Sequence, residues 1–242
     1  QKMVEISVKK LLGLETDQNL VNLLINYDQP IASPKTQLKL NGPRMGASMT
    51  FGETGERLIA SKDVGGFDMY PATFQFGWQQ EFQYLSAGNF QGLFEFIPMI
   101  GGLESGKFIP SLTVLNGFRF GKGGWEFAFG PTFRIVQKAD GFFDKDGYLG
   151  EKGQWHLENE WHKTNMKDTT LNIASLQRPP IVSRLDSRGS AKLSTGRVLA
   201  LGKTLKSGYL NMPVNIYVSP RKDGTIVGAS FGFNIFKKPK VQ

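Results

Sequence analysis

Residues Phe74-Gln-Phe-Gly-Trp-Gln-Gln-Glu-Phe-Gln-Tyr84 decide the fold class of this chain. The even positions are aromatic except for Gln80, and the odd positions are mostly amides with one carboxylate. Successive side chains of a β-strand point to opposite faces, so the stretch predicts a strand with one aromatic face and one polar face. A soluble barrel with its apolar face inward would show the same alternation, and further features must separate the two.

The same alternation continues in three further segments that end at Val136. Their polar positions are Gln91, Glu95, Ser111, Thr113, Arg119, Glu126, Thr132 and Arg134. Their apolar positions are Phe90, Phe94, Phe96, Leu112, Val114, Phe118, Trp125, Phe127, Phe129, Phe133 and Ile135. Small outer-membrane barrels of about eight strands are filled by interior side chains. We therefore predict barrel-interior ion pairs among Glu81, Glu95, Arg119, Glu126 and Arg134, and we prefer this to paired catalytic carboxylates.

The connections between these segments alternate in length. Residues 86–89, 121–124 and 206–208 are tight turns that contain glycine, and longer links lie between them. Short periplasmic turns and long external loops are typical of outer-membrane barrels. Pro98, Pro110 and Pro131 fit strand ends and bulges, where a missing backbone donor is tolerated.

Composition excludes several classes of protein. The chain has 242 residues, and its mean hydropathy of −0.26 includes no run of about 18 apolar residues, which excludes a transmembrane helix. A transmembrane β-barrel stays possible because only alternate residues face lipid. The absence of cysteine excludes disulfides, thiol catalysis and cysteine-based zinc sites. A start at Gln1 without a leader favours a mature, processed form.

The net charge is +8 and the isoelectric point is about 9.6, which raises the question of nucleic acid. The basic residues are spread over turns and tails, without the interleaved aromatic residues of a nucleic-acid-binding patch. We expect no nucleic-acid partner. Lysine and arginine at membrane borders would instead face anionic headgroups or a partner protein.

Residues 1–43 are predicted as a periplasmic N-terminal extension with an amphipathic helix. Asp17 is placed to cap this helix, and one face would carry Leu20, Leu23, Leu24 and Tyr27. The helix would pack against its own barrel or bind a partner, and we regard Leu20, Leu23 and Leu24 as candidate partner-binding residues.

The predicted barrel spans residues 44–236 and is followed by a basic periplasmic tail, 237–242. The first strand is expected at residues 42–52 with Met45, Ala47, Met49 and Phe51 outward, followed by an external loop at 53–72. A long extracellular loop is expected at about 137–189. It contains His156, His162, and two further candidate partner-binding residues, Trp155 and Trp161. We expect this loop to be the recognition surface, with disorder or shielding of the barrel as the alternatives.

The last three strands are predicted after this loop. Leu199, Leu201 and Leu205 would face outward on the sixth, with Arg197 near a membrane border. Five alternating apolar residues from Leu210 to Val218 predict the seventh. The eighth contains Gly228, Phe231 and Phe233, which resemble the terminal-strand insertion signal of bacterial outer-membrane barrels, although Ile226 stands where that signal has a polar residue.

Six short motifs resemble one known family. They are Gly42-Pro-Arg-Met-Gly46, Gln75-Phe-Gly-Trp-Gln79, Gly101-Gly-Leu-Glu-Ser-Gly106, Phe108-Ile-Pro-Ser-Leu112, Trp125-Glu-Phe-Ala-Phe-Gly-Pro131 and Asn211-Met-Pro-Val-Asn215. Together they resemble a family of small Gram-negative outer-membrane β-barrels, many of them from the Bacteroidota. The resemblance covers roughly residues 42–236 apart from the long loop. It implies a fold and an outer-membrane location with periplasmic termini, and it supplies no catalytic residues.

No motif in the chain indicates a catalytic or metal site, and we expect no cofactor. His156 and His162 are about 20 Å apart if the segment is extended, and on a helix they lie on different faces, so they do not form a metal pair. Asp144-Lys-Asp-Gly147 begins like a calcium loop, but its glycine comes too early and Trp155 stands at the closing glutamate position, so a turn is expected.

The function predicted from the sequence is therefore non-enzymatic. The chain would be an outer-membrane anchor or an accessory subunit of an export, uptake or barrel-insertion assembly, in contact with outer-membrane lipid and with other outer-membrane proteins. Two alternatives stay open: a lipid-modifying enzyme that uses a loop histidine, and a soluble ligand-binding barrel.

Overall fold

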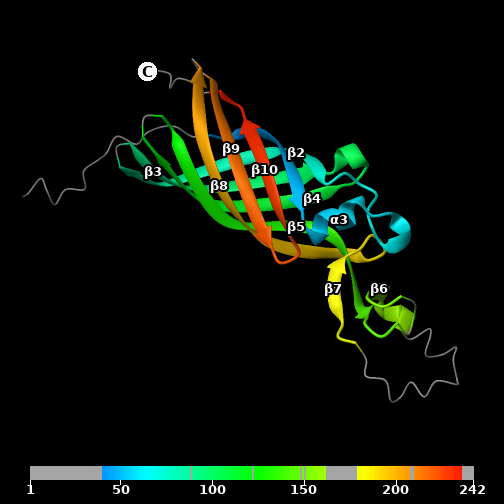
Figure 1. The fold of residues 1–242 in the computed structure, drawn as a ribbon. Helices are drawn as coiled ribbons and strands as arrows, with labels where there is room; N and C mark the ends of the chain where they lie inside the picture. Colours follow the sequence, from blue (N-terminus) through cyan, green and yellow to red (C-terminus); the bar gives the residue numbers. More distant parts are fainter. Residues whose placement is uncertain are drawn as a thin grey trace, which may run out of the picture.

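The computed structural model describes residues 40–87, 89–121, 123–147, 149, 151–161, 179–207 and 210–235. Eight strands form the barrel wall (Figure 1): β1 (Gly42–Phe51), β2 (Ala72–Ala87), β3 (Phe90–Gly101), β4 (Ile109–Phe120), β5 (Trp125–Asp144), β8 (Ser190–Ser207), β9 (Leu210–Arg221) and β10 (Gly224–Gly232). Each pairs antiparallel with the next in this order, and β10 pairs back with β1. The sheet is a closed up-and-down barrel, which confirms the predicted all-β fold class.

The closing seam joins the first and last strands of the ring. Met45 pairs with Phe231, Ala47 with Ala229 and Met49 with Val227. Closure leaves no unpaired strand edge in the ring, and β11 (Asn234–Ile235) adds a short pairing with β9. We call the end where β2–β3, β4–β5 and β8–β9 are joined the short-turn end, and the opposite end, where the other four links lie, the loop end.

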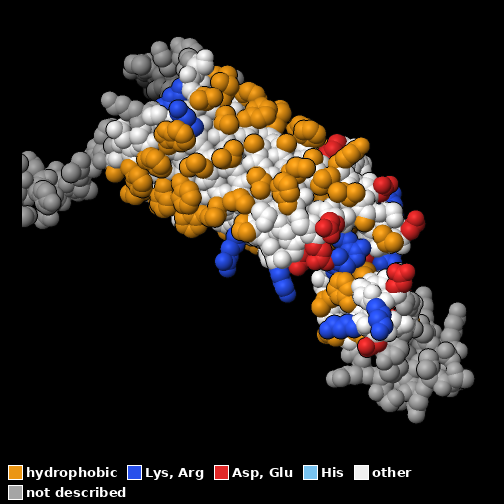
Figure 2. Space-filling model, viewed as in Figure 1, with side chains coloured by type: hydrophobic (Ala, Val, Ile, Leu, Met, Phe, Trp, Pro, Cys, Tyr) orange, Lys and Arg blue, Asp and Glu red, His pale blue; other side chains and the backbone are white. Residues whose placement is uncertain are grey.

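The outer face of the wall is apolar and largely aromatic (Figure 2). Trp78 and Ile216 are 52% and 59% exposed there, and large apolar side chains cover the wall on several strands: Phe74, Phe76, Phe82, Phe94, Phe96, Phe127, Phe129, Leu199, Leu201 and Phe231. Gln80, which interrupts the aromatic alternation, is a polar residue on this outer face. A protein in water would not expose so much contiguous apolar surface. The arrangement opposes a soluble ligand-binding barrel.

The barrel interior changes character along its axis. Near the short-turn end it is filled by buried charged and amide side chains, among them Glu81, Glu95 and Arg119. A small apolar cluster follows, formed by Ile97, Leu115, Ala128, Val198 and Ala200. Arg134, Ser194 and Arg221 line a cavity closer to the loop end. The interior therefore has two separate polar layers.

The link between β1 and β2 contains a helix, α3 (Glu53–Ile59), and a 3₁₀ turn, η1 (Lys62–Val64), where the sequence predicted only an external loop. Residues 67–69 turn back on α3, since the amide of Met69 donates to the carbonyl of Leu58 at 2.7 Å. Phe67 and Met69 are buried beneath it. A second 3₁₀ turn, η2 (Leu103–Ser105), links β3 to β4. Helices in the described ranges are all too short or too polar to span a membrane.

The long link predicted at about 137–189 begins later than expected, because β5 continues to Asp144. Beyond the barrel β5 pairs with β6 (Gln154–Leu157) and with β7 (Val182–Leu185), and Gly141 pairs with both Leu157 and Val182. We call this unit, residues 139–161 and 181–188, the arm; it projects from the loop end (Figure 1). Beyond the barrel, β6 and β7 replace β4 and β8 as the hydrogen-bonded neighbours of β5. The strand therefore continues where the sequence alternation no longer predicts a strand.

Two further predictions fall outside the described residues. They are the N-terminal helix with Leu20, Leu23 and Leu24, and the basic tail at 237–242.

Candidate functional site

The centre of the interior network is Arg119, on β4 near the short-turn end. Its Nη2 atom lies 2.6 Å from Oε2 of Glu81 and 2.6 Å from Oε2 of Glu126. Its Nη1 atom also donates to Oε1 of Gln91 at 3.2 Å. One guanidinium therefore joins carboxylates from β2 and β5, and all three charged groups are almost fully buried. Charge-assisted hydrogen bonds of this kind are the strong ones in proteins.

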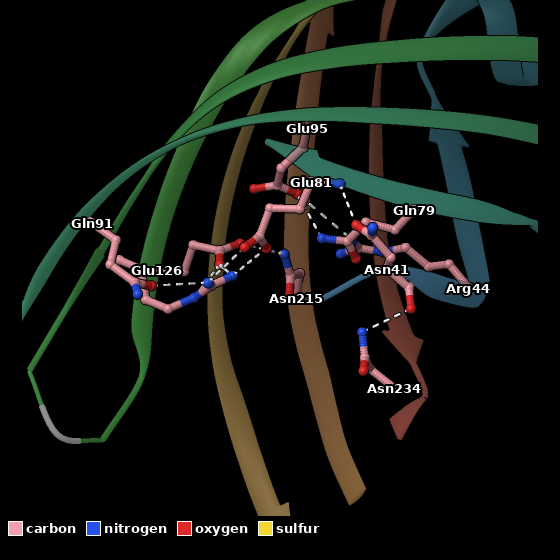
Figure 3. A network of polar contacts seen from close by, with 10 residues as sticks. Asn41, Arg44, Gln79, Glu81, Gln91, Glu95, Glu126, Asn215 and Asn234 are labelled. Carbon is pink, nitrogen blue, oxygen red and sulfur yellow. Dashed lines mark hydrogen bonds and ion pairs between the residues drawn. The ribbon is translucent and has the colours of Figure 1, made fainter. Parts of the chain in front are cut away.

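A second arginine, Arg44 on β1, completes the network from the other side of the barrel (Figure 3). Its Nη1 atom donates to Oε1 of Gln79 at 2.6 Å and lies 3.8 Å from Oε2 of Glu95. Gln79 in turn donates to the same Glu95 oxygen at 3.1 Å. Nε of Arg44 donates to Ser230 at 3.1 Å, across the closing seam. The network thereby links the first strand of the ring to the last one.

Asn215 lies between the two halves of this network. In one amide orientation Nδ2 donates to Oε1 of Glu126 at 3.4 Å, and in the other its oxygen accepts from Nη2 of Arg44 at 2.9 Å. Leu40 and Asn41 cover the network from the short-turn end. Leu40 is 1% exposed, and Asn41 accepts a 2.7 Å hydrogen bond from the backbone amide of Glu81. The lumen is filled with side chains at this level.

The structure brings four of the five predicted interior residues together. Glu81, Arg119 and Glu126 form one group, while Glu95 lies closest to Arg44, which the predicted set did not include. The signal for Arg44 was present, because it alternates with the outward Met45. Arg134 lies apart, near the loop end, and makes no ion pair with any described carboxylate. The apolar cluster around Ala128 separates it from the network.

The two tryptophans predicted to bind a partner pack against other aromatic side chains of the arm, and a role in partner binding stays a prediction. Trp161 is 7% exposed and meets the ring of Phe142 edge-on at 5.5 Å. Trp155 packs against Phe143 at 5.2 Å, and the guanidinium of Arg184 lies 5.5 Å from its ring. Their large apolar surfaces contribute to the internal packing of this small unit.

Asp186 lies where the arm meets the link between β1 and β2, since the amide of Ser187 donates to the carbonyl of Gly65 at 3.0 Å. Asp186 accepts hydrogen bonds from Nε1 of Trp155 at 3.0 Å and from the side chain of Arg188. Burial raises the pKa of Asp186, but the hydrogen bonds from Arg188 and Trp155 outweigh burial and hold the pKa below its ordinary value. A Cβ at Gly65 would lie 2.2 Å from this carboxylate, so glycine is required for the close approach. Arg184 also forms an ion pair with Glu53 of α3.

His156 contacts a carboxylate and an aromatic ring inside the arm. Nδ1 of His156 lies 3.0 Å from Oε2 of Glu160, and its ring stacks on Phe142. His162 lies outside the described ranges. Over those same ranges, no cluster of three potential metal ligands occurs. Asp144 accepts from the amides of Gly147 and Leu149 at 2.8 and 2.6 Å, as a turn requires.

The residues of the predicted insertion signal belong to the wall and the segment after it. A Cβ at Gly228 would lie 2.4 Å from Cζ of Tyr217, so the glycine makes room for that ring. Phe231 lies on the outer face, and its ring meets that of Phe233 edge-on at 5.5 Å. A role in insertion stays a prediction.

No protein-family model and no curated protein matches the sequence of this chain. Among solved structures, the chain is similar to Ail, the attachment invasion locus protein of Yersinia pestis, with 10% identity over 81% of this chain and 97% of that one. The TM-score is 0.40, which is too low to support an inference. The fold therefore rests on the closed ring of hydrogen-bonded strands, and function must be argued from the chain's own residues.

Proposed function

We propose that this protein is a non-enzymatic outer-membrane barrel that anchors the arm at the membrane surface, as an accessory subunit of a larger outer-membrane assembly. The main support for the proposal is that the two faces of the barrel wall are the reverse of those in a soluble protein. Apolar side chains are outside and charged side chains are inside, on a ring without free edges. Only closed barrels and helices satisfy all backbone hydrogen bonds within lipid.

We infer the direction of insertion from the two ends of the barrel. Outer-membrane barrels have short turns toward the periplasm and longer loops outside. Here the chain enters β1 and leaves β10 at the short-turn end, since Arg44 pairs with Gly232. We infer that this end is periplasmic and that α3, η2 and the arm are external.

Anchoring is favoured over transport because the lumen is filled. Arg44, Arg119 and three buried glutamates occupy the interior near the short-turn end, and Leu40 covers them. A barrel of about eight strands has room for side chains rather than for a water channel. Small solutes would have no continuous path.

The arm is the part suited to a partner protein. Its aromatic residues make it an ordered unit, and the edge of β7 carries exposed apolar side chains at Ile181 and Val182, which are 39% and 42% exposed. Apolar residues at the centre of a surface patch are typical of protein interfaces. An export, uptake or barrel-insertion machine would be the assembly.

Purification from outer membranes tests both parts of this proposal. Without detergent the chain should stay with the membrane, and in mild detergent mass spectrometry should detect a second protein at a fixed ratio. Replacing Ile181 and Val182 with serine should remove that protein, whereas the control Leu103→Ser, on the exposed η2 turn, should not. A chain that elutes alone would contradict the subunit role, and extraction without detergent would contradict the membrane location.

A further inference from the structure

The loop end of the barrel contains a cavity that the anchoring role does not use. Its volume is about 530 Å³. The barrel contributes polar lining residues, including Arg134, Ser194 and Arg221, and the link between β1 and β2 contributes Phe67 and Met69. The cavity therefore has a charged wall and an apolar wall, which is typical of sites for organic ligands.

The two arginines in this cavity have donors without acceptors. Nε of Arg134, and both Nε and Nη2 of Arg221, are buried and have no hydrogen-bond partner among the described residues. Nη1 of Arg221 donates to Oγ of Ser194 at 3.0 Å. Arg119, in contrast, directs its donors at two glutamates and a glutamine. Leaving buried donors unmatched is costly, so native proteins retain them where something else supplies the acceptor.

The other charged groups around the cavity increase its positive character. Lys107, Lys138 and Lys222 also line it, and Asp223 is the one acidic residue among the described lining residues. A concave surface lined by one sign of charge concentrates ions of the opposite sign. The cavity is therefore suited to an anion.

The wall is shaped to hold Arg221 in place. A Cβ at Gly196 of β8 would lie 3.0 Å from Nη2 and 3.2 Å from Nε of Arg221. Glycine at this position allows the guanidinium to lie against the backbone, with Ser194 fixing one nitrogen. A donor group that is already held loses less freedom when a ligand binds.

We infer that this cavity binds a phosphate group between Arg134 and Arg221, with the apolar side of the ligand against Phe67 and Met69. Two guanidiniums match the nearly twofold negative charge of a phosphate monoester better than the single charge of a carboxylate. Guanidinium also presents paired donors that match phosphate oxygens. The phosphate would come from a lipid headgroup or from a free phosphate ester, and the same two arginines would bind either.

Calorimetry on the full-length protein tests this site. The protein would be held in nanodiscs of uncharged phosphatidylcholine and titrated with inorganic phosphate and with glycerol phosphate. In a second arm, nanodiscs containing phosphatidic acid would be compared with the uncharged ones by the midpoint of thermal unfolding, which rises when a ligand binds only the folded state. Binding in the first arm identifies a free phosphate ester as sufficient, and a rise only in the second arm identifies a lipid headgroup.

The variant R134Q/R221Q should weaken binding by at least about tenfold, or abolish the rise, because two charge-assisted contacts are removed. R134K/R221K keeps the charge but loses the paired donors, and it should also weaken binding. Arg197→Gln is the matched control, since it removes a charge from the outer face of β8. No response to any probe, or an equal response in R134Q/R221Q, would overturn the inference.

Discussion

The two polar layers of the barrel interior use arginine in opposite ways. In the short-turn half, Arg44 and Arg119 direct their donors at buried glutamates and amides, and those contacts link β1, β2, β3, β4 and β5. In the loop-end half, Arg134 and Arg221 line a cavity, and three of their nitrogen atoms have no hydrogen-bond partner among the described residues. The first layer links strands through ion pairs, whereas the arginines of the second line a cavity and have no ion-pair partner among the described residues. Within one small barrel, the short-turn layer therefore contributes to stability, and the loop-end layer is available for the proposed binding.

The largest effect should come from Arg119→Met. This change leaves Glu81 and Glu126 buried without their cation, which typically costs about 3–5 kcal/mol of unfolding free energy. Urea unfolding in lipid vesicles would measure the loss. Arg197→Met, on the outer face of the same barrel, is the control. Equal stability of R119M and R197M would mean that the network contributes nothing to the fold.

A pair of glycine substitutions compares the two halves directly. A Cβ at Gly117 would lie 2.8 Å from Oε1 of Glu95, whose Oε2 atom accepts a hydrogen bond from Gln79. We expect Gly117→Ala to destabilise the barrel by about 1–3 kcal/mol, as overpacking usually does. Gly196→Ala should cost less because its Cβ would come no closer than 3.0 Å to Arg221. The same urea titrations would rank the two, and the reverse order would contradict the assignment of the halves.

Arg134→Met should have a smaller effect, and in the opposite direction. The arginine has no ion-pair partner among the described residues, so replacing it removes the free-energy cost of burying an unpaired charge. We expect stability in phosphate-free buffer to be unchanged or higher by about 1 kcal/mol. A loss as large as that of R119M would show that Arg134 belongs to the stabilising network.

The smallest expected effect concerns the arm and acid pH. The pKa of Asp186 is lowered in the folded protein, against about 3.9 when unfolded, so its contribution is complete above about pH 4 and is lost as pH falls through the folded pKa. The protection factors of the amides at residues 154–157 against hydrogen exchange should therefore fall below about pH 4 and stay constant between about pH 5 and 8.

A control separates this group from its neighbour. Hydrogen bonds from Lys192 and Ser183 lower the pKa of Asp140, which titrates in the same window. Asp186→Asn should remove the acid transition of the arm, while Asp140→Asn should keep it. A transition that survives in D186N would assign the effect to another carboxylate.

Alternation in the sequence predicted the barrel strands because their two faces contact different surroundings. Even Arg197 falls on the outer face where the pattern puts it. The interior was predictable only as a set of inward charges, since pairing depends on the stagger between strands. Arg119 and Glu126 are cross-strand partners, but Arg134 lies opposite Ser111 and Ser194. The alternating pattern does not show which residues of neighbouring strands lie opposite each other.

The external parts were harder to predict for a different reason. Once a segment leaves the barrel, its side chains no longer alternate between two environments, so periodicity carries less information. The strands β6 and β7 are four residues each and depend on pairing with the extension of β5. Trp155 and Trp161 looked available for a partner because burial within the arm depends on contacts with Phe142 and Phe143. Those contacts exist only in the folded arm.

The seam between β1 and β10 also determines the order in which the barrel strands can pair. The hydrogen bond from Arg44 to Ser230 spans 186 positions of the chain. Strand β1 therefore stays unpaired on one side until β10, the last strand of the ring, has formed. Contacts between such distant residues are slow to form, and open edges invite association with other chains in the meantime. We expect the chain to depend on chaperones until the ring closes. Loss of β10 would leave the edges of both β1 and β9 unpaired.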